Sequence, residues 1–358
     1  MTSKDRFLST CRFESTDRPP VDYLAHPEAD RKLKEYLKCK TEDELLEALG
    51  CDFYYLSCRD ISQNEGHLKC YVGAELDITD DQRVCPLGIR WRRGAYDSKF
   101  AVDEAIRGPL EDAQSEAAIL GHRWPKAADF DFSVLLEECE PHSDKVIVGG
   151  PWSGIMGDSY RLHGYENFLV NIALRPELIK TLVSRVTDTY LELNDKMFTQ
   201  LKGKLDVWFF GNDFGSQNGL LVSEPMWLDF FFEPIKQLVE LAHSHGLKAM
   251  MHSCGGISLI IPHLIRAGVD ILDPIQTTAL GMEPDGLREQ FGRKIVFHGG
   301  VDTQNVLPFG TPNQVAEHAS DMLKRLGGDG GYIFAPSQIL GPDIPAENIA
   351  RMYGVISN

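Results

Sequence analysis

The sequence predicts an α/β fold, a (β/α)8 TIM barrel that takes in residues 1–358 as a single domain. From residue 140 onward one unit repeats: a short apolar run, a polar or glycine-rich turn, and a stretch with helical periodicity. Two earlier apolar runs bring the number of predicted strands to eight, and eight strands alternating with helices favour a closed barrel over an open sheet. The predicted strands are 20–24, 52–56, 146–150, 207–213, 248–254, 271–276, 295–300 and 331–336.

Two helices and one insertion complete this prediction. Residues 225–245 carry apolar side chains at three- and four-residue spacing, and residues 312–326 begin with a proline, which the first helical turn tolerates. Residues 57–140 interrupt the alternation: runs at 70–74, 83–91 and 94–96 predict hairpin strands, followed by an acidic helical stretch. We therefore expect an insertion after the second strand that lies over the barrel mouth.

Charge and composition exclude several classes of partner. The chain has 36 lysines and arginines against 53 aspartates and glutamates, a formal net charge of −17, which disfavours nucleic acid. No apolar run approaches the roughly 20 residues of a membrane helix, and the first residues lack the apolar segment of a secretory signal. The eight cysteines are scattered, which indicates reduced thiols. We expect a cytoplasmic protein with no membrane partner. Whether it forms a homodimer stays open.

Polar side chains follow almost every predicted strand. In a barrel of this class the carboxyl ends of the strands form the face that carries the chemistry. A purely structural role as helix cap or turn former explains Asn, Asp and Ser at such places, and this role stays open for individual strand-end residues. It does not explain His, Cys and Gln. These strand-end residues are His26, Cys58, Arg59, Trp152, Asn212, Asp213, His252, Cys254, Gln276, His298, Asp302, Ser337 and Gln338.

The segment His252-Ser253-Cys254-Gly255-Gly256 is the most informative of these. Residues i and i+2 at a strand end point to the same side, so an imidazole and a thiol reach one ion, and such N/S ligands favour zinc. A third ligand has to come from another loop, with Asp213, Glu224 and the weaker Gln338 as candidates. Without a metal, His252 is a general acid or hydrogen-bond donor and Cys254 a packed thiol, an alternative that stays open.

Further roles follow from the remaining strand-end residues. Trp152 and Phe214 are expected to line an apolar pocket, whereas His298 and Asp302 flank two glycines that either let backbone approach a ligand or form a tight turn capped by Asp302. The predicted catalytic residues are Asp213, His252, His298 and Gln338, the predicted substrate-binding residues are His26, Trp152, Phe214, Gln276 and Asp302, and the predicted metal ligands are His252, Cys254 and Glu224.

Several co-linear motifs resemble the uroporphyrinogen decarboxylase superfamily over almost the full length of the chain. The resemblance implies the (β/α)8 barrel independently of the strand count. It is carried by Gly149-Gly-Pro-Trp-Ser, Asn212-Asp-Phe-Gly-Ser-Gln-Asn-Gly, Met251-His-Ser-Cys-Gly-Gly, Leu272-Asp-Pro-Ile-Gln, Gly299-Gly-Val-Asp-Thr-Gln, Phe334-Ala-Pro-Ser-Gln and Pro342-Asp-Ile-Pro-Ala-Glu-Asn.

The sequence departs from the decarboxylases at one informative place. In the decarboxylases that the sequence resembles, an early Arg-Pro is followed by an arginine-rich stretch that binds the substrate's carboxylates. Here Arg18-Pro19 is followed by Pro20-Val-Asp-Tyr-Leu-Ala-His26. The His-x-Cys of His252 and Cys254 instead resembles the corrinoid-linked methyltransferase branch, whose members hold zinc with His, Cys and a later Cys. Ser337 and Gln338 stand where that later Cys is expected.

Three functional hypotheses result. The leading one is a methyltransferase, zinc-assisted, that moves a methyl group between a small methylated or methoxylated substrate, or a methyl acceptor, and cobalamin carried on a separate corrinoid protein. The second is decarboxylation of a porphyrinogen. The third is a non-catalytic barrel that binds a corrinoid or an aromatic ligand.

Overall fold

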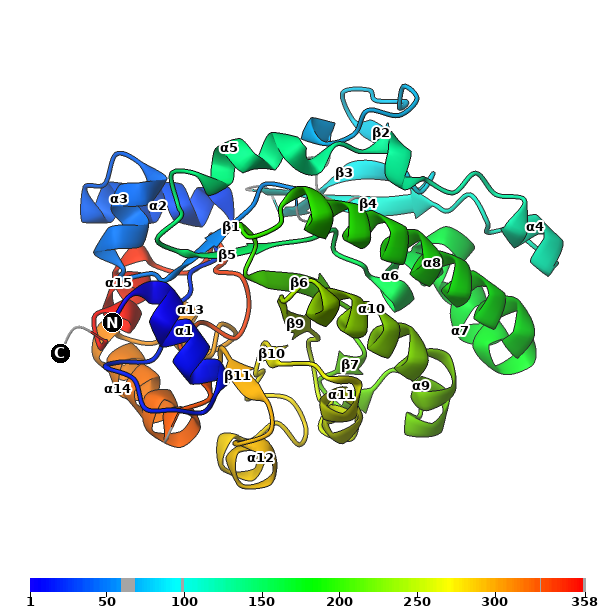
Figure 1. Cartoon of the computed structure of the whole chain (residues 1–358). Helices are drawn as coiled ribbons and strands as arrows, with labels where there is room; N and C mark the ends of the chain where they lie inside the picture. Colours follow the sequence, from blue (N-terminus) through cyan, green and yellow to red (C-terminus); the bar gives the residue numbers. More distant parts are fainter. Residues whose placement is uncertain (59–67, 98–99, 329, 357–358) are drawn as a thin grey trace.

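A computed structural model describes residues 1–58, 68–97, 100–328 and 330–356, and the predicted barrel fold is confirmed. Seven parallel strands form one sheet in the order β1-β5-β6-β9-β10-β11-β12, and Figure 1 shows this sheet curled on itself with helices around it. The strands are β1 (Phe53–Tyr55), β5 (Val146–Gly149), β6 (Val207–Gly211), β9 (Lys248–His252), β10 (Ile271–Asp273), β11 (Val296–His298) and β12 (Tyr332–Ile333).

The first predicted strand, residues 20–24, closes the barrel. Val21 forms a parallel bridge with Phe334, which directly follows β12. On the other side, the backbone N–H of Asp52 donates to the carbonyl of Val21 at 2.8 Å, just before β1 begins. This short segment therefore lies between the first and last strands of the sheet, so the ring of hydrogen-bonded strands has no free edge there.

The helices cover the outside of the sheet, and their starts follow ordinary capping chemistry. Ser223 caps α9 and Thr311 forms a capping box at α14, each with a proline in the first turn. The predicted helix 225–245 is two helices, because Phe231 leaves the helical conformation between them. The helices are α1 (Ser3–Cys11), α2 (Pro27–Leu37), α3 (Glu42–Ala48), α4 (Glu116–Leu120), α5 (Leu136–Cys139), α6 (Ile155–His163), α7 (Tyr165–Leu174), α8 (Pro176–Gln200), α9 (Glu224–Phe230), α10 (Phe232–Ser244), α11 (Ile261–Ala267), α12 (Pro284–Phe291), α13 (Val306–Phe309), α14 (Pro312–Met322) and α15 (Ala346–Tyr353).

The insertion carries an antiparallel sheet of β2 (Gln82–Val84), β3 (Arg90–Asp97) and β4 (Phe100–Arg107). Hairpin strands are present as expected, although residues 70–74 contribute only the isolated bridge between Tyr71 and Phe130, and residues 100–107 form a strand that was not predicted. Pairing with β3 decides this, since Arg92 and Glu104 lie opposite each other with 2.9 Å between their charged groups. Figure 1 shows this sheet next to α6 and α8, and Arg161 of α6 lies over the ring of Trp91.

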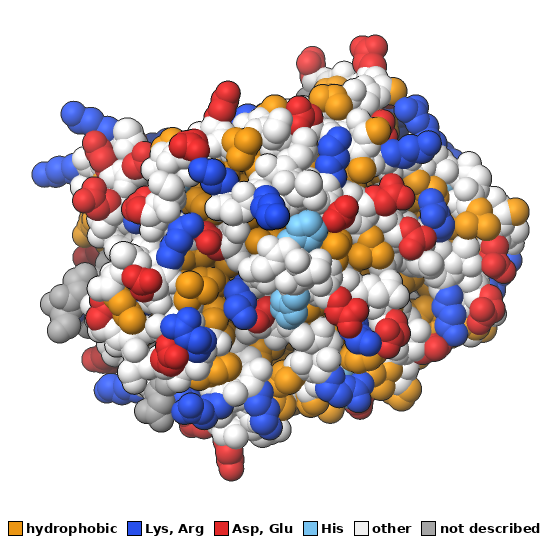
Figure 2. All heavy atoms as spheres, viewed as in Figure 1, with side chains coloured by type: hydrophobic (Ala, Val, Ile, Leu, Met, Phe, Trp, Pro, Cys, Tyr) orange, Lys and Arg blue, Asp and Glu red, His pale blue; other side chains and the backbone are white. Residues whose placement is uncertain are grey.

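Helix α1 covers the end of the barrel where the strands begin, on the face turned to the viewer in Figure 1. Arg6 on α1 and Arg18 both contact Asp52, each with a closest distance of 2.6 Å, and Asp52 is 1% exposed. Figure 2 shows the same face, on which acidic and basic side chains are interspersed. None of the helices in the described ranges combines the length and the apolar character that crossing a bilayer requires.

We expect Asp52→Ala to lower the free energy of unfolding by about 3–5 kcal/mol, because it leaves two arginines without their shared buried partner. Urea denaturation measures this change. The matched control is Glu14→Gln, which breaks the exposed Arg12–Glu14 pair and should leave the midpoint almost unchanged. Equal effects of the two substitutions would contradict the assignment of Asp52 as the buried ion-pair partner of both arginines.

Candidate functional site

Three neighbouring strands end in polar, buried residues at the same level. His252 is the last residue of β9 and is paired in register with Asp273, the last residue of β10. Leu272 pairs with Phe297, so Asp273 stands level with His298 at the end of β11. The three residues are 9%, 7% and 5% exposed, respectively. Strand register therefore brings these side chains together inside the barrel.

Asp273 lies between the two imidazoles. Its Oδ2 is 2.6 Å from Nδ1 of His252, in a hydrogen bond, and its Oδ1 is 2.6 Å from Nδ1 of His298, in an ion-pair contact that is not aligned as a hydrogen bond. Nε2 of His298 lies 2.8 Å from Oδ2 of Asp22, which is 1% exposed and also accepts from the hydroxyl of Tyr55 at 2.6 Å. Carboxylates and imidazoles thus alternate across the barrel.

His252 connects this buried chain to a group at the surface. Its Nε2 lies 3.3 Å from Sγ of Cys254 and 3.5 Å from Oδ1 of Asp213. One ligand atom from each of these three residues lies within 4.8 Å of the others, and the side chain of Asp213 is 56% exposed. We call Asp213, His252 and Cys254 the mouth cluster. Its nitrogen, sulfur and oxygen atoms are the donor types found in zinc sites.

The charges of the network support one another. Burial lowers the pKa of His298, but the charge of Asp273 and the contacts with Asp22 outweigh burial and raise the pKa to about 10. Burial likewise opposes ionisation of His252, yet its contacts with Asp213, Asp273 and Cys254 raise its pKa well above the ordinary value. The pKa of Asp213 falls to about 2, because the hydrogen bond and charge of His252 outweigh the effect of partial burial. His298 is therefore a cation between carboxylates, and His252 is one in the absence of a metal, which would displace the proton at Nε2.

The loop after β9 is held in place by its neighbours. The backbone N–H of Cys254 donates to Oδ1 of Asp213 at 2.9 Å, and that of Gly255 donates to Oε1 of Gln276 at 2.8 Å. Gly255 has φ +85°, and a Cβ there would lie 2.5 Å from the backbone of Gly215. Nε2 of Gln338 lies 2.9 Å from Sγ of Cys254. Gln276 thus holds the loop, and Gln338 faces its sulfur.

An aromatic wall stands beside His252. The ring of Trp152 has its centroid 5.3 Å from that of His252 and 5.2 Å from that of Phe209, and Tyr55 contacts Phe209 at 5.8 Å. Gly211 at the end of β6 permits this arrangement, since a Cβ there would lie 1.9 Å from the ring of Trp152. We call Tyr55, Trp152 and Phe209 the aromatic wall.

Several predicted site residues have other partners. Oε1 of Glu224 lies 2.7 Å from Nε2 of His263, and Asp213, not Glu224, belongs to the mouth cluster. Phe214 is 0% exposed and packs on Trp227 and Phe231, so its side chain is part of the core and does not line an open pocket.

Two more predicted residues act as caps. Nδ1 of His26 accepts from the backbone N–H of Glu28 at the start of α2. Asp302 accepts from the backbone N–H of Gln304 at 2.7 Å and of Asn305 at 3.1 Å, which bears out the capping alternative for this residue. Cys58 is buried, and Arg59 lies outside the described residues.

Sequence reasoning missed Asp22, Asp273, Tyr55 and Phe209. A signal for the two aspartates was present, because each interrupts an apolar run that was predicted to be a buried strand. A buried carboxylate in such a run requires a partner.

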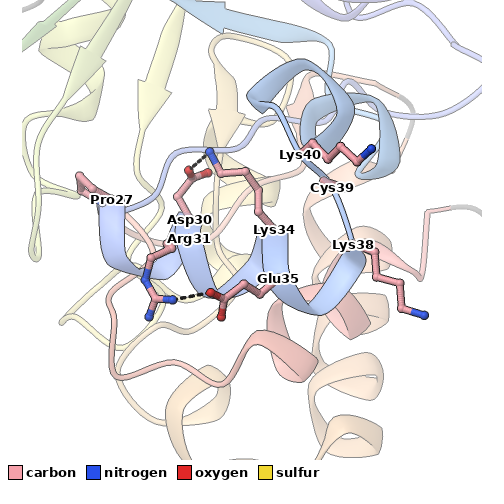
Figure 3. A pocket seen from close by; sticks show the side chains of 8 residues that line it. All are labelled: Pro27, Asp30, Arg31, Lys34, Glu35, Lys38, Cys39 and Lys40. Carbon is pink, nitrogen blue, oxygen red and sulfur yellow. Dashed lines mark hydrogen bonds and ion pairs between the residues drawn. The ribbon is translucent and has the colours of Figure 1, made fainter.

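A separate hollow lies on the outer face of α2 (Figure 3). Four of its charged side chains form ion pairs along the helix: Lys34 lies 2.5 Å from Asp30, and Arg31 lies 2.6 Å from Glu35. It contains none of the residues of the mouth cluster. It is lined by Pro27, Asp30, Arg31, Lys34, Glu35, Lys38, Cys39 and Lys40.

Comparisons with known proteins agree with the fold. The structure is similar to a methyltransferase from Methanosarcina mazei, with a TM-score of 0.65 and 17% identity over 100% of this chain and 98% of that one. Curated relatives called uroporphyrinogen decarboxylase include one from Magnetococcus marinus, 22% identical over 375 residues (98% of this chain, 96% of the relative), and one from Coxiella burnetii, 22% identical over 366 residues (99% and 94%). The family model described as Uroporphyrinogen decarboxylase (URO-D) matches residues 145–358, more than half of the chain. The chain therefore belongs to the URO-D family.

Proposed function

We propose that this protein is a methyltransferase that moves a methyl group between a small methylated substrate and a corrinoid carried by a separate protein. The observation that carries the proposal is the mouth cluster, in which Asp213, His252 and Cys254 converge at the carboxyl ends of the strands. In barrel enzymes this is the end at which chemistry takes place. The similarity to a solved methyltransferase is consistent with the proposal but supports only the fold.

The donor set of the mouth cluster fits a zinc ion. A thiolate, an imidazole and a carboxylate are all common zinc ligands, and three protein ligands leave a fourth position for substrate. When bound there, zinc would supply Lewis acidity toward a heteroatom of the substrate. Because the cluster has one sulfur and one carboxylate, it is harder than a two-cysteine site, which favours an oxygen of a methoxylated donor over a thiol acceptor.

The protein's own groups around the cluster have separable roles. The amide of Gln338 donates toward Sγ of Cys254 at 2.9 Å and so orients the sulfur. Asp213 is on the exposed side of the cluster, where its ionised carboxylate offers an oxygen ligand to the metal. The aromatic wall offers an apolar surface to the organic part of the substrate.

The segment after the early Arg-Pro argues against decarboxylation of a porphyrinogen, because residues 20–26 contain no arginine. Nη1 of Arg18 lies 2.6 Å from Oδ2 of Asp52, which directly precedes β1, so this guanidinium is engaged where the strands begin. The mouth cluster lies at the other end of the strands. A substrate with eight carboxylates requires several free cations at the mouth, and Arg18 does not provide one.

His298 has a different role from the catalytic one expected. With both ring nitrogens against carboxylates and 5% exposure, it is a structural cation in this proposal.

Substitution of the ligands tests the metal site. We expect purified wild-type protein to bind about one zinc per chain by elemental analysis, and His252→Ala, Cys254→Ser and Asp213→Asn to lose it. Glu224→Gln is the matched control, because Glu224 was the alternative third ligand and pairs with His263. Substoichiometric zinc that none of these substitutions changes would overturn the metal site and favour a non-catalytic ligand-binding barrel.

Activity separates the two enzyme hypotheses. We expect methyl transfer from a methoxylated aromatic compound to free cob(I)alamin, followed by absorbance, and no conversion of uroporphyrinogen under the same conditions. The reason is the donor set together with the missing arginine-rich stretch after Arg18-Pro19. Loss of carboxylates from uroporphyrinogen in proportion to time would revive the decarboxylase hypothesis.

The role of His298 predicts a pH dependence of stability. Its pKa rises from an ordinary value near 6.5 to about 10 on folding, so its stabilisation is complete below about pH 6.5 and is lost as the pH rises through about 10. We expect the difference in unfolding free energy between wild type and His298→Gln to be largest at pH 6 and to shrink toward pH 10. Urea denaturation across this range measures it. A difference that stays constant from pH 6 to pH 10 would show that His298 is not held as a cation.

A further inference from the structure

A shared carboxylate determines which nitrogen of His252 faces the mouth cluster. Oδ2 of Asp273 and Nδ1 of His252 lie 2.6 Å apart in a hydrogen bond, which implies an N–H group at Nδ1 of His252, and Oδ1 of Asp273 meets Nδ1 of His298 in an ion-pair contact. An ionised carboxylate meets both of these groups at once, one with each oxygen. An asparagine has one acceptor oxygen and meets only one of them.

The far end of this row of alternating carboxylates and imidazoles restrains Asp273 in turn. His298 lies between Asp273 and Asp22, and the second oxygen of Asp22 accepts from the backbone N–H of Tyr23 at 2.8 Å. Tyr55 donates to the same oxygen of Asp22 as His298. Asp22 is therefore fixed by the strand that closes the barrel and by β1. Neither Asp273 nor His298 can rotate without breaking a contact of a buried charge.

With Nδ1 of His252 occupied, only Nε2 is available to the mouth cluster. This nitrogen is the one that lies 3.3 Å from Sγ of Cys254 and 3.5 Å from Oδ1 of Asp213. A 180° ring flip would put Cε1 in the place of Nε2 at the cluster and leave Oδ2 of Asp273 without its N–H.

We infer that Asp273 is a positioning residue, which, held by His298 and Asp22, locks His252 with Nε2 toward Asp213 and Cys254. The inference deepens the proposed function, because it assigns a residue outside the mouth cluster to the binding of the metal. Carboxylates that accept from the free nitrogen of a metal-binding histidine contribute about 10–100-fold to metal affinity.

The test compares two aspartates on the same strand segment. We expect Asp273→Asn to weaken Zn²⁺ binding about 10–100-fold in a chelator competition, because the amide holds the imidazole less firmly. Asp270→Asn is the matched control: Asp270 comes just before β10, and its Oδ2 also pairs with a histidine, His243, at 2.7 Å. It should bind Zn²⁺ like wild type. Equal affinity of wild type and Asp273→Asn would overturn the inference.

A second readout does not depend on the metal or on the variant. In protein labelled with ¹⁵N-histidine and prepared without metal, we expect Nδ1 of His252 to carry a proton that exchanges slowly with water and resonates far downfield. The signal should persist when Zn²⁺ is added and lose its downfield shift in Asp273→Asn. A wild-type spectrum with Nδ1 of His252 unprotonated would overturn the inference, even if Asp273→Asn does not fold. If wild type binds no Zn²⁺ but shows the proton, the metal site fails and the positioning of His252 stands.

Discussion

The carboxylate of Asp273, buried between two imidazoles, is the interaction on which the rest of this site depends. Removing one partner from such a buried charge network costs about 3–5 kcal/mol, so its members constrain one another strongly. The network needs the last residues of β9, β10 and β11 at one level, and the observed strand register provides this. It also needs Asp22, which lies on the strand that closes the barrel. Barrel closure and site geometry are thus connected through the same side chains.

The same arrangement connects the buried network to the mouth cluster. His252 belongs to both, with Nδ1 directed into the barrel and Nε2 directed to the mouth cluster. The surrounding loops keep the cluster open to solvent on the side of Asp213 while Trp152 covers His252. Two glycines make this possible, since Gly211 admits the ring of Trp152 and Gly255 admits the backbone that follows Asp213. A polar cluster beside an apolar wall is the combination expected for a small organic substrate.

The sequence was sufficient for the fold because the barrel is encoded by a repeated local pattern. Apolar runs separated by amphipathic stretches predict strands and helices whatever their tertiary contacts. The break at Phe231 and the strand Phe100–Arg107 were not predicted, because the first is a single backbone departure and the second depends on pairing with β3. Local periodicity contains neither kind of information.

Only part of the site was predictable for a related reason. His252 and Cys254 are close in sequence, so spacing alone brings them together, and Asp213 comes at the end of the neighbouring strand. The choice between Asp213 and Glu224 required knowledge of where α9 begins and of the contact with His263. Asp273 and Asp22 were missed because their importance comes from partners on other strands. Their placement within apolar runs was the available signal, and it is a useful one for other barrels.

X-ray absorption at the zinc edge of the metal-loaded wild-type protein tests the central claim most directly. The account predicts one sulfur at about 2.3 Å, with nitrogen and oxygen ligands at about 2.0–2.2 Å and an imidazole signature in the outer shells. A shell of only light atoms, without sulfur, would mean that zinc does not bind to Cys254. Two sulfurs would contradict the mixed cluster of Asp213, His252 and Cys254.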